Sequence, residues 1–226
     1  MRDLRRAWCA VAVAAMVVPA AASAQSGQNL ERPEHWKVRY DGSDEATERN
    51  FVVMRPGWHV YAGPAGLLWD PGRFASGNYA VKSTIYLFPK GDPERSGSTR
   101  VDTPFGLFLG GSDLEGDTPT YVSFLVDNSG RFRIARHAGD DIEQLVPWTS
   151  HDAVTLLDEP ATSPAENLLE VDVRGEQAIF YIGGEAVADL PSDELDLNGL
   201  IGLNAGEGLS LHITEVAIGP NRRSDR

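Results

Sequence analysis

The stretch from Asn167 to Leu190, NLLEVDVRGEQAIFYIGGEAVADL, alternates apolar and polar side chains in short segments that end at glycines. In its first segment every second side chain is apolar and points to one side of an extended chain, at Leu169, Val171 and Val173. The residues between them, Glu170 and Asp172, point to the other side, which is typical of an antiparallel strand with one face in water. The sequence therefore predicts strands joined by tight hairpin turns.

The same period of two recurs along most of the chain. Strands are predicted at 78–88, 120–127, 131–136, 167–175, 177–184, 186–190, 199–206 and 209–219. There is no long apolar stripe of helical period, and a single helical turn is expected within residues 191–199. Many short strands with little helix predict an all-β fold, a two-sheet antiparallel β-sandwich of the jelly roll type.

The N-terminus has the three parts of a secretory signal peptide. Three arginines precede an apolar run at residues 7–18, and small residues follow up to Ala24, after which cleavage is expected. The run is shorter than the roughly 20 residues of a membrane span. We therefore expect an exported protein, periplasmic or extracellular in a bacterium. The predicted parts are a signal peptide at 1–24, a flexible segment at 25–34, a β-sandwich domain at 35–219 and a charged tail at 220–226.

Composition excludes several classes of function. The formal net charge is −13, which makes nucleic acid and anionic membrane surfaces poor partners. Cys9, the one cysteine, lies inside the signal peptide, so the mature domain has neither a disulfide nor a thiol nucleophile. Sequence motifs of serine hydrolases, zinc proteases and phosphate-binding loops are also missing.

The order of these segments resembles a known group of proteins. The run from Asn167 to Leu190, followed by LNGLIGLNAGEGLSLHITEVAI at 197–218, is similar to the closing strands of concanavalin A-like jelly rolls of the laminin-G type. Earlier segments, GWHVYAGPAGLLW, YAVKSTIYLF, FGLFLGG and YVSFLVDNSGRFRIAR, resemble the opening strands of bacterial exported proteins of the keto-disaccharide hydrolase-like group. Many relatives have Asn-Gly where this chain has Gly183-Gly184, and both pairs allow the positive φ of the turn.

A first candidate site is the stretch RPGWHVYAGPAGLLWDP at 55–71. Sugars are bound by aromatic faces together with polar groups that satisfy their hydroxyls. Trp58 and Tyr61 offer rings and His59 offers a donor or acceptor, although His59 could equally be a structural histidine. Trp69 is expected to pack in the core instead.

A second candidate is the stretch LVPWTSHDAV at 145–154, which we interpret as a polar turn after a strand. Its chemistry-bearing residues are Trp148, Thr149, Ser150, His151 and Asp152. The alternative is a solvated connection in which Trp148 only fills space.

A third candidate lies on the strands at 120–136. Alternation places Tyr121, Ser123, Arg131 and Arg133 on the face opposite Phe124 and Phe132. If that face is concave, a tyrosine and two guanidinium groups meet there and suit a sugar or a uronate. If it is convex, they are ordinary exposed residues.

The leading hypothesis is an exported lectin-like domain that binds a carbohydrate without catalysis. Its expected ligand-binding residues are Trp58, His59, Tyr61, Tyr121, Arg133 and Trp148. The family resemblance implies an alternative, a glycoside-processing hydrolase, whose candidate acids and bases are His59, His151, Asp152 and Glu170. A structural or protein-binding sandwich is the second alternative.

No cofactor is expected. The loops YDGSDEATE at 40–48 and GGSDLEGDT at 110–118 carry several carboxylates, the oxygen ligands that calcium prefers. Neither loop has the spacing of a known calcium loop, and a structural calcium ion stays an open alternative.

Overall fold

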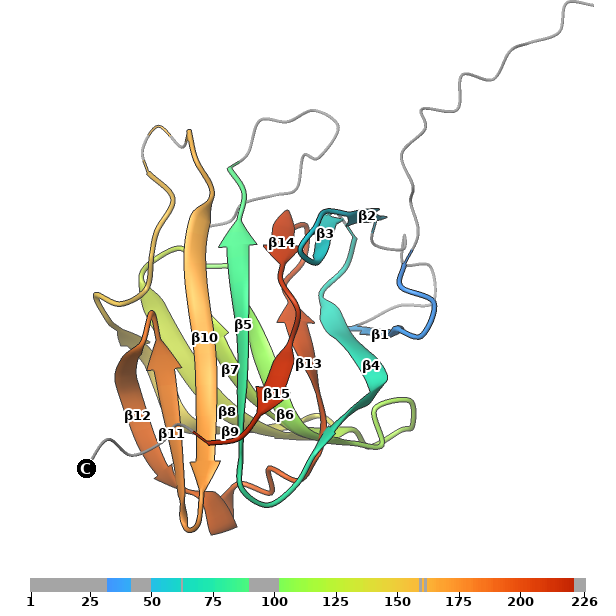
Figure 1. Cartoon of the computed structure of the whole chain (residues 1–226), viewed down its shortest axis with the longest axis vertical. Coiled ribbons are helices and arrows are strands. Elements are labelled where there is room, and N and C mark those ends of the chain that lie inside the picture. The colour runs from blue at the N-terminus through green and yellow to red at the C-terminus, as the bar shows by residue number, and fades with distance from the viewer. Residues whose placement is uncertain are drawn as a thin grey trace, which may run out of the picture.

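The computed structural model describes residues 32–41, 50–61, 63–89, 102–158, 160 and 162–221. The predicted signal peptide lies outside this part of the chain. Strands dominate it, and they form two antiparallel sheets that face each other (Figure 1). The predicted antiparallel β-sandwich is therefore confirmed. No helix in the described ranges is long and apolar enough to cross a membrane.

The seven-stranded sheet is called sheet A. Its strands in spatial order are β1 (Lys37–Tyr40), β4 (Gly66–Ala75), β13 (Gly199–Ala205), β6 (Phe105–Ser112), β7 (Thr120–Val126), β8 (Arg131–Ala138) and β9 (Asp141–Ser150).

The eight-stranded sheet is called sheet B and lies in front in Figure 1. Its strands in spatial order are β12 (Glu185–Pro191), β11 (Gln177–Ile182), β10 (Ala165–Arg174), β5 (Tyr79–Leu87), β14 (Leu211–Ile213), β3 (Trp58–Tyr61) and β2 (Asn50–Val53), with β15 (Ala217–Gly219) also paired to β5. The predicted helical turn is the short 3-10 helix η1 (Ser192–Glu194).

The main core lies between the inner faces of the two sheets. Phe124 of sheet A and Phe180 of sheet B are both fully buried, and their ring centroids lie 5.2 Å apart in an edge-to-face arrangement. Leu169, Val171 and Val173 also belong to this core, as their alternation predicts. Apolar burial between the sheets is thus what holds them together.

The polar face of β10 was predicted to lie in water, and this prediction is wrong. Glu170 has 6% of its surface exposed and Asp172 none. Asp172 accepts hydrogen bonds from Arg174 at 2.5 Å and from Asn221 at 2.8 Å. Asn221 belongs to the C-terminal segment that follows β15. A central strand whose outer face is crossed by the C-terminal segment buries polar groups that a charged partner must satisfy.

Two segments differ from the sequence prediction. The predicted strand at 209–219 is interrupted and forms β14 and β15. Residues 145–150 were interpreted as a turn, but β9 continues to Ser150, so Trp148 lies within a strand. The strand β9 is an exposed sheet edge and contains Pro147, so it lacks the buried alternation that reveals inner strands.

A smaller apolar cluster lies on the outer face of sheet A. It consists of Leu67, Trp69, Phe108 and Leu114, and we call it the outer cluster. Trp69 therefore packs against apolar neighbours as expected, but outside the main core. Leu114 belongs to the segment 112–119, which Arg39 fastens to β1 by donating to the carbonyls of Leu114 at 3.1 Å and Gly116 at 2.7 Å.

Candidate functional site

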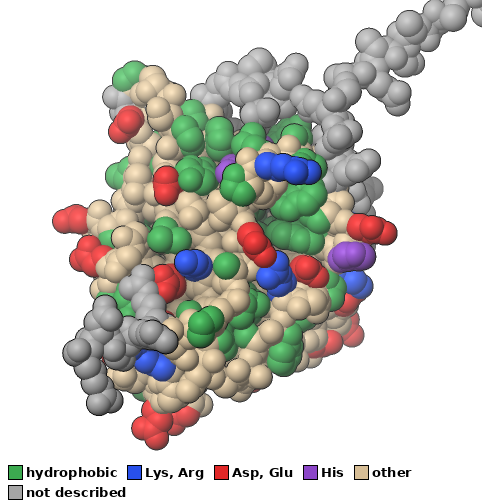
Figure 2. Space-filling view, in the orientation of Figure 1, with side chains coloured by type: hydrophobic (Ala, Val, Ile, Leu, Met, Phe, Trp, Pro, Cys, Tyr) green, Lys and Arg blue, Asp and Glu red, His purple; other side chains and the backbone are tan. Residues whose placement is uncertain are grey.

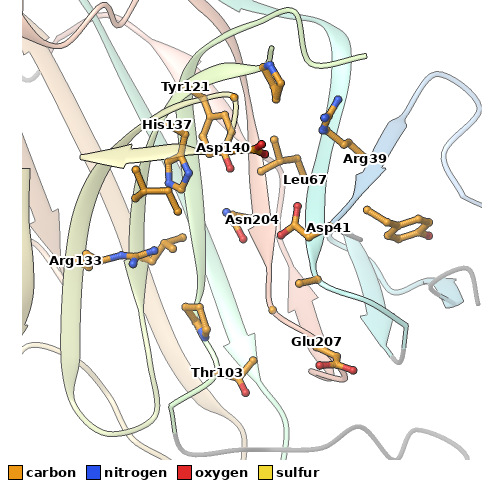
Figure 3. Close-up of a pocket in the computed structure, with 18 of the residues that line it drawn as sticks. Arg39, Asp41, Leu67, Thr103, Tyr121, Arg133, His137, Asp140, Asn204 and Glu207 are labelled. Atoms are coloured by element: carbon orange, nitrogen blue, oxygen red, sulfur yellow. The ribbon is translucent and has the colours of Figure 1, made fainter. Parts of the chain in front are cut away.

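A groove of about 700 Å³ lies on the outer face of sheet A, beside the outer cluster. Six strands and their adjoining turns contribute to it, so the sheet surface itself forms the floor. Figure 3 shows Arg133 at one side of this groove and Arg39 at the other, with Tyr121, His137, Asn204 and Asp41 between them. We call it the sheet A groove. Its principal lining residues are Arg39, Asp41, Leu67, Thr103, Tyr121, Leu125, Arg133, His137, Asp140, Asn204 and Glu207.

One register row crosses the groove from β13 to β8. Asn204 pairs with Gly106, Gly106 with Leu125, and Leu125 with Arg133 across four neighbouring strands. Side chains in one row point to the same face of a sheet. Asn204 and Arg133 are thus three strand spacings apart, about 14 Å. A ligand that reaches both must be longer than a single sugar ring.

Tyr121 and His137 form a stacked pair inside the groove. They are direct partners on β7 and β8, with ring centroids 4.2 Å apart and planes 10° from parallel. The His137 Nε2 atom is hydrogen-bonded to the buried Ser123 hydroxyl at 2.9 Å. This contact fixes the imidazole, because the ring is held from both its face and its edge.

Burial keeps both members of this pair uncharged near neutral pH. It lowers the pKa of His137 to about 4, with a further contribution from the Arg133 charge. It also raises the pKa of Tyr121 to about 12, with the Asp41 charge as a second cause. The pair can therefore donate and accept hydrogen bonds, but it supplies no charge to the groove.

The depressed pKa of His137 predicts a loss of stability in acid. The unfolded chain binds this proton near the ordinary pKa of 6.5, whereas the folded chain does so only near 4. The free energy of unfolding is therefore not reduced by His137 above pH 6.5. As the pH falls from 6.5 towards 4, protonation of the unfolded chain lowers this free energy by up to about 3 kcal/mol. Urea unfolding of the wild type and the His137→Gln variant at several pH values measures it. Equal pH slopes in the two proteins would contradict this assignment.

Arg133 and Arg131 both lie over the ring of the same tryptophan, Trp148, but differ in their other partners. Their guanidinium carbons are 5.0 and 5.2 Å from the Trp148 ring centre, close enough for cation–π contact. Arg131 also forms an ion pair with Asp127 at 2.6 Å. Arg133 is half-buried, its Nε atom is buried without a hydrogen-bond partner, and burial lowers its pKa. Arginine nevertheless stays protonated in proteins.

The hairpin between β7 and β8 holds this side of the groove in place. Asp127 is buried at its turn and accepts hydrogen bonds from the Ser129 amide at 2.9 Å and from its hydroxyl at 2.6 Å. Arg131 donates to the same carboxylate from Nε at 3.0 Å and from Nη2 at 2.6 Å. Gly130 completes the turn with φ at +82°. One carboxylate thus fixes the register that brings Tyr121 opposite His137.

The sequence candidates fall on both sheets. Tyr121 and Arg133 line the sheet A groove, and Trp148 lies against Arg133. Trp58, His59 and Tyr61 instead form β3 of sheet B. Figure 2 shows the outer face of sheet B, where side chains of both charge signs are interspersed among hydrophobic ones.

The β3 residues have other surroundings. His59 is fully buried, and its Nε2 atom is hydrogen-bonded to the Ser210 hydroxyl at 3.0 Å. Trp58 lines a separate pocket of about 270 Å³ together with Trp36 and Trp69. The six ligand-binding candidates therefore do not form one site.

The four hydrolase candidates occupy different places. His59 and Glu170 belong to strands of sheet B that are separated by β14 and β5, which corresponds to about 14 Å. His151 follows β9, next to the exposed Asp152, and its Nε2 atom is 3.9 Å from the Glu185 carboxylate. Hydrolysis needs its acids and bases around one bond. This set does not provide that arrangement.

Neither candidate calcium loop gathers a ligand set in the described part of the chain. No three His, Cys, Asp or Glu side chains in the described ranges are grouped so that they could hold a metal ion. In the loop at 110–118, the Asp113 carboxylate accepts hydrogen bonds from the Thr118 amide at 3.0 Å and its hydroxyl at 3.1 Å. Most of the loop at 40–48 lies outside the described residues, and a structural calcium ion stays the open alternative to the expectation of no cofactor.

Sequence reasoning missed three groove residues. His137 continues the alternation of Arg131 and Arg133 by two further steps, but the predicted strand stopped at residue 136. Asn204 is the polar residue between the buried Leu203 and Ala205, and Arg39 lies on a strand that was not predicted. The alternation of β8 and β13 could have revealed the first two.

Comparisons with known proteins identify the fold. No protein family model matches the sequence, and a search of curated proteins finds no relative. Among solved structures, the carbohydrate binding module CBM66 from Bacillus subtilis aligns with a TM-score of 0.55 and 12% identity, over 82% of this chain and 95% of that one. A mixed linkage glucan GH16 protein from Bacteroides ovatus aligns with a TM-score of 0.54 and 11% identity, over 84% of this chain and 97% of that one. Alginate lyase A1-II', a member of polysaccharide lyase family-7, aligns with a TM-score of 0.50 and 11% identity, over 83% of this chain and 95% of that one.

The chain therefore has a concanavalin A-like jelly roll fold, as the sequence resemblance implied. At these identities the likeness is one of fold. Similarity to the keto-disaccharide hydrolase-like group in particular stays a prediction from the sequence.

Proposed function

We propose that this chain is an exported carbohydrate-binding protein and that the sheet A groove is its binding site. The N-terminal pattern supports export. The volume of the groove, about 700 Å³, suits a ligand of several rings. The neighbouring fold of a carbohydrate binding module is consistent with this function.

The observation that carries the proposal is the register row from Asn204 to Arg133. Both ends of the row present planar polar groups to the groove, and neither group has a carboxylate or amide partner in the described part of the protein. Sugar hydroxyls need such groups, because a buried hydroxyl without a partner is costly. Between them, Tyr121 and His137 add a neutral donor and acceptor pair.

A glycan array with two variants tests the location of the site. Asn204→Ala removes the polar group at one end of this row and should weaken binding about tenfold, the typical effect of a lost ligand hydrogen bond. Trp58→Ala, in the separate pocket that residues of both sheets line, should leave binding unchanged. Binding that is lost in Trp58→Ala and retained in Asn204→Ala would move the site to that pocket. A folded wild type that binds no glycan would contradict the proposed function.

A further inference from the structure

Arg133 forms no ion pair with a carboxylate in the described region, unlike the arginines around it on sheets A and B. Four of them form ion pairs with carboxylates: Arg73 with Glu215, Arg131 with Asp127, Arg136 with Glu143, and Arg174 with Asp172. Arg133 has the Trp148 ring on its face and an unbonded, buried Nε atom on its edge. The Nε atom of this half-buried guanidinium is removed from water and has no hydrogen bond in the protein to replace its hydration, which is energetically costly.

The residues around Arg133 do not supply the missing negative charge. Its register partner Leu125 is apolar, and the nearby Tyr121 and His137 are neutral. Trp148 covers a face of the guanidinium and Nε is buried, so the edge formed by its two terminal nitrogens remains for a ligand to reach. Two parallel N–H groups on that edge match the two oxygens of a carboxylate.

From this geometry we infer that the ligand of the sheet A groove is an oligosaccharide containing a uronic acid, whose carboxylate binds the edge of Arg133. This inference rests on the proposed function. It also gives the ligand a direction, because the carboxylate lies at β8 and the neutral part of the ligand extends towards Asn204 on β13.

The opposite side of the groove restricts the ligand further. Asp41 and Glu207 line that side (Figure 3), and a second carboxylate of the ligand would meet them. The net charge of −13 also repels highly charged polysaccharides before contact. The favoured ligand therefore has one uronate among neutral sugars rather than a uronate at every position.

The test is an array that pairs each uronate-containing oligosaccharide with its carboxyl-reduced counterpart, so that only the charge differs. The wild type should bind the carboxylate member of a recognised pair about 10- to 100-fold more tightly, as expected for a charge-assisted hydrogen bond. Arg133→Gln should abolish the preference, and Arg133→Lys should retain a small part of it, since lysine keeps the charge but not the fork.

Arg136→Gln is the matched control, because Arg136 is on the same strand and contacts Glu143 instead of the groove. It should bind like the wild type. Circular dichroism confirms that each variant is folded, and Arg133→Lys serves if Arg133→Gln does not fold. Equal binding of both members of every recognised pair, or a preference that is undiminished in the Arg133 variants, would overturn the inference while leaving carbohydrate binding intact. Failure to bind any glycan, charged or neutral, would instead reject the proposed function.

Discussion

Replacing Asp127 with alanine is expected to lower the free energy of unfolding by about 3 to 5 kcal/mol, the usual effect of removing one partner from a buried ion pair. Asp127 is 1% exposed and accepts bonds from both Ser129 and Arg131. Without it, the turn loses its hydrogen bonds and Arg131 loses its counter-charge. Chemical denaturation monitored by tryptophan fluorescence measures the change.

The control for this variant is Asp141→Ala. Asp141 is an exposed acid in the neighbouring hairpin, and its removal should change stability by no more than about 0.5 kcal/mol. Asp127→Asn keeps the shape of the side chain without its charge and should fall between the two. If Asp127→Ala unfolds at the same denaturant concentration as the wild type, strand pairing alone holds the hairpin and the role assigned to this carboxylate is wrong.

Replacing Phe124 with alanine should also cost about 3 to 5 kcal/mol, as truncation of a buried phenylalanine does elsewhere. Phe124 is fully buried, and it contacts Phe132 of its own sheet and Phe180 of the facing sheet. The variant leaves a cavity where the two sheets meet. Thermal and urea unfolding both report the loss.

Phe74→Ala provides the comparison, because Phe74 has the same side chain but is 60% exposed on sheet A. Its stability should stay within about 0.5 kcal/mol of the wild type. Similar losses in the two variants would show that inter-sheet packing at Phe124 is not what stabilises the sandwich.

The fold could be predicted because its signal is local. A period of two is a property of each strand by itself, and β5, β7 and β10 all have it in their sequence. Alternation fails to predict a strand or its exposed face where the strand does not have one buried face and one exposed face. The edge strand β9 has no buried face to produce alternation, and the outer side of β10 is covered by a C-terminal segment that local sequence does not reveal.

The site could be predicted only in part, because it depends on register. Alternation placed Tyr121 and Arg133 on one face, and the structure has them there. Alternation does not tell which strand lies next to which, so it could not bring Asn204 and Arg39 to the same groove. The aromatic residues of β3 looked equally suitable in the sequence, yet they belong to the other sheet.

The outer cluster holds the segment 112–119 in place separately from the main core, which joins the two sheets. That segment is fastened by Leu114 and by the Arg39 contacts, whereas the two sheets are joined by a different set of side chains. This segment contributes Pro119 to the groove, and it can therefore change in length or composition at little cost to folding. For protein engineering, this makes residues 112–119 the natural place to graft a new specificity, and in evolution it lets selectivity drift while the scaffold is preserved.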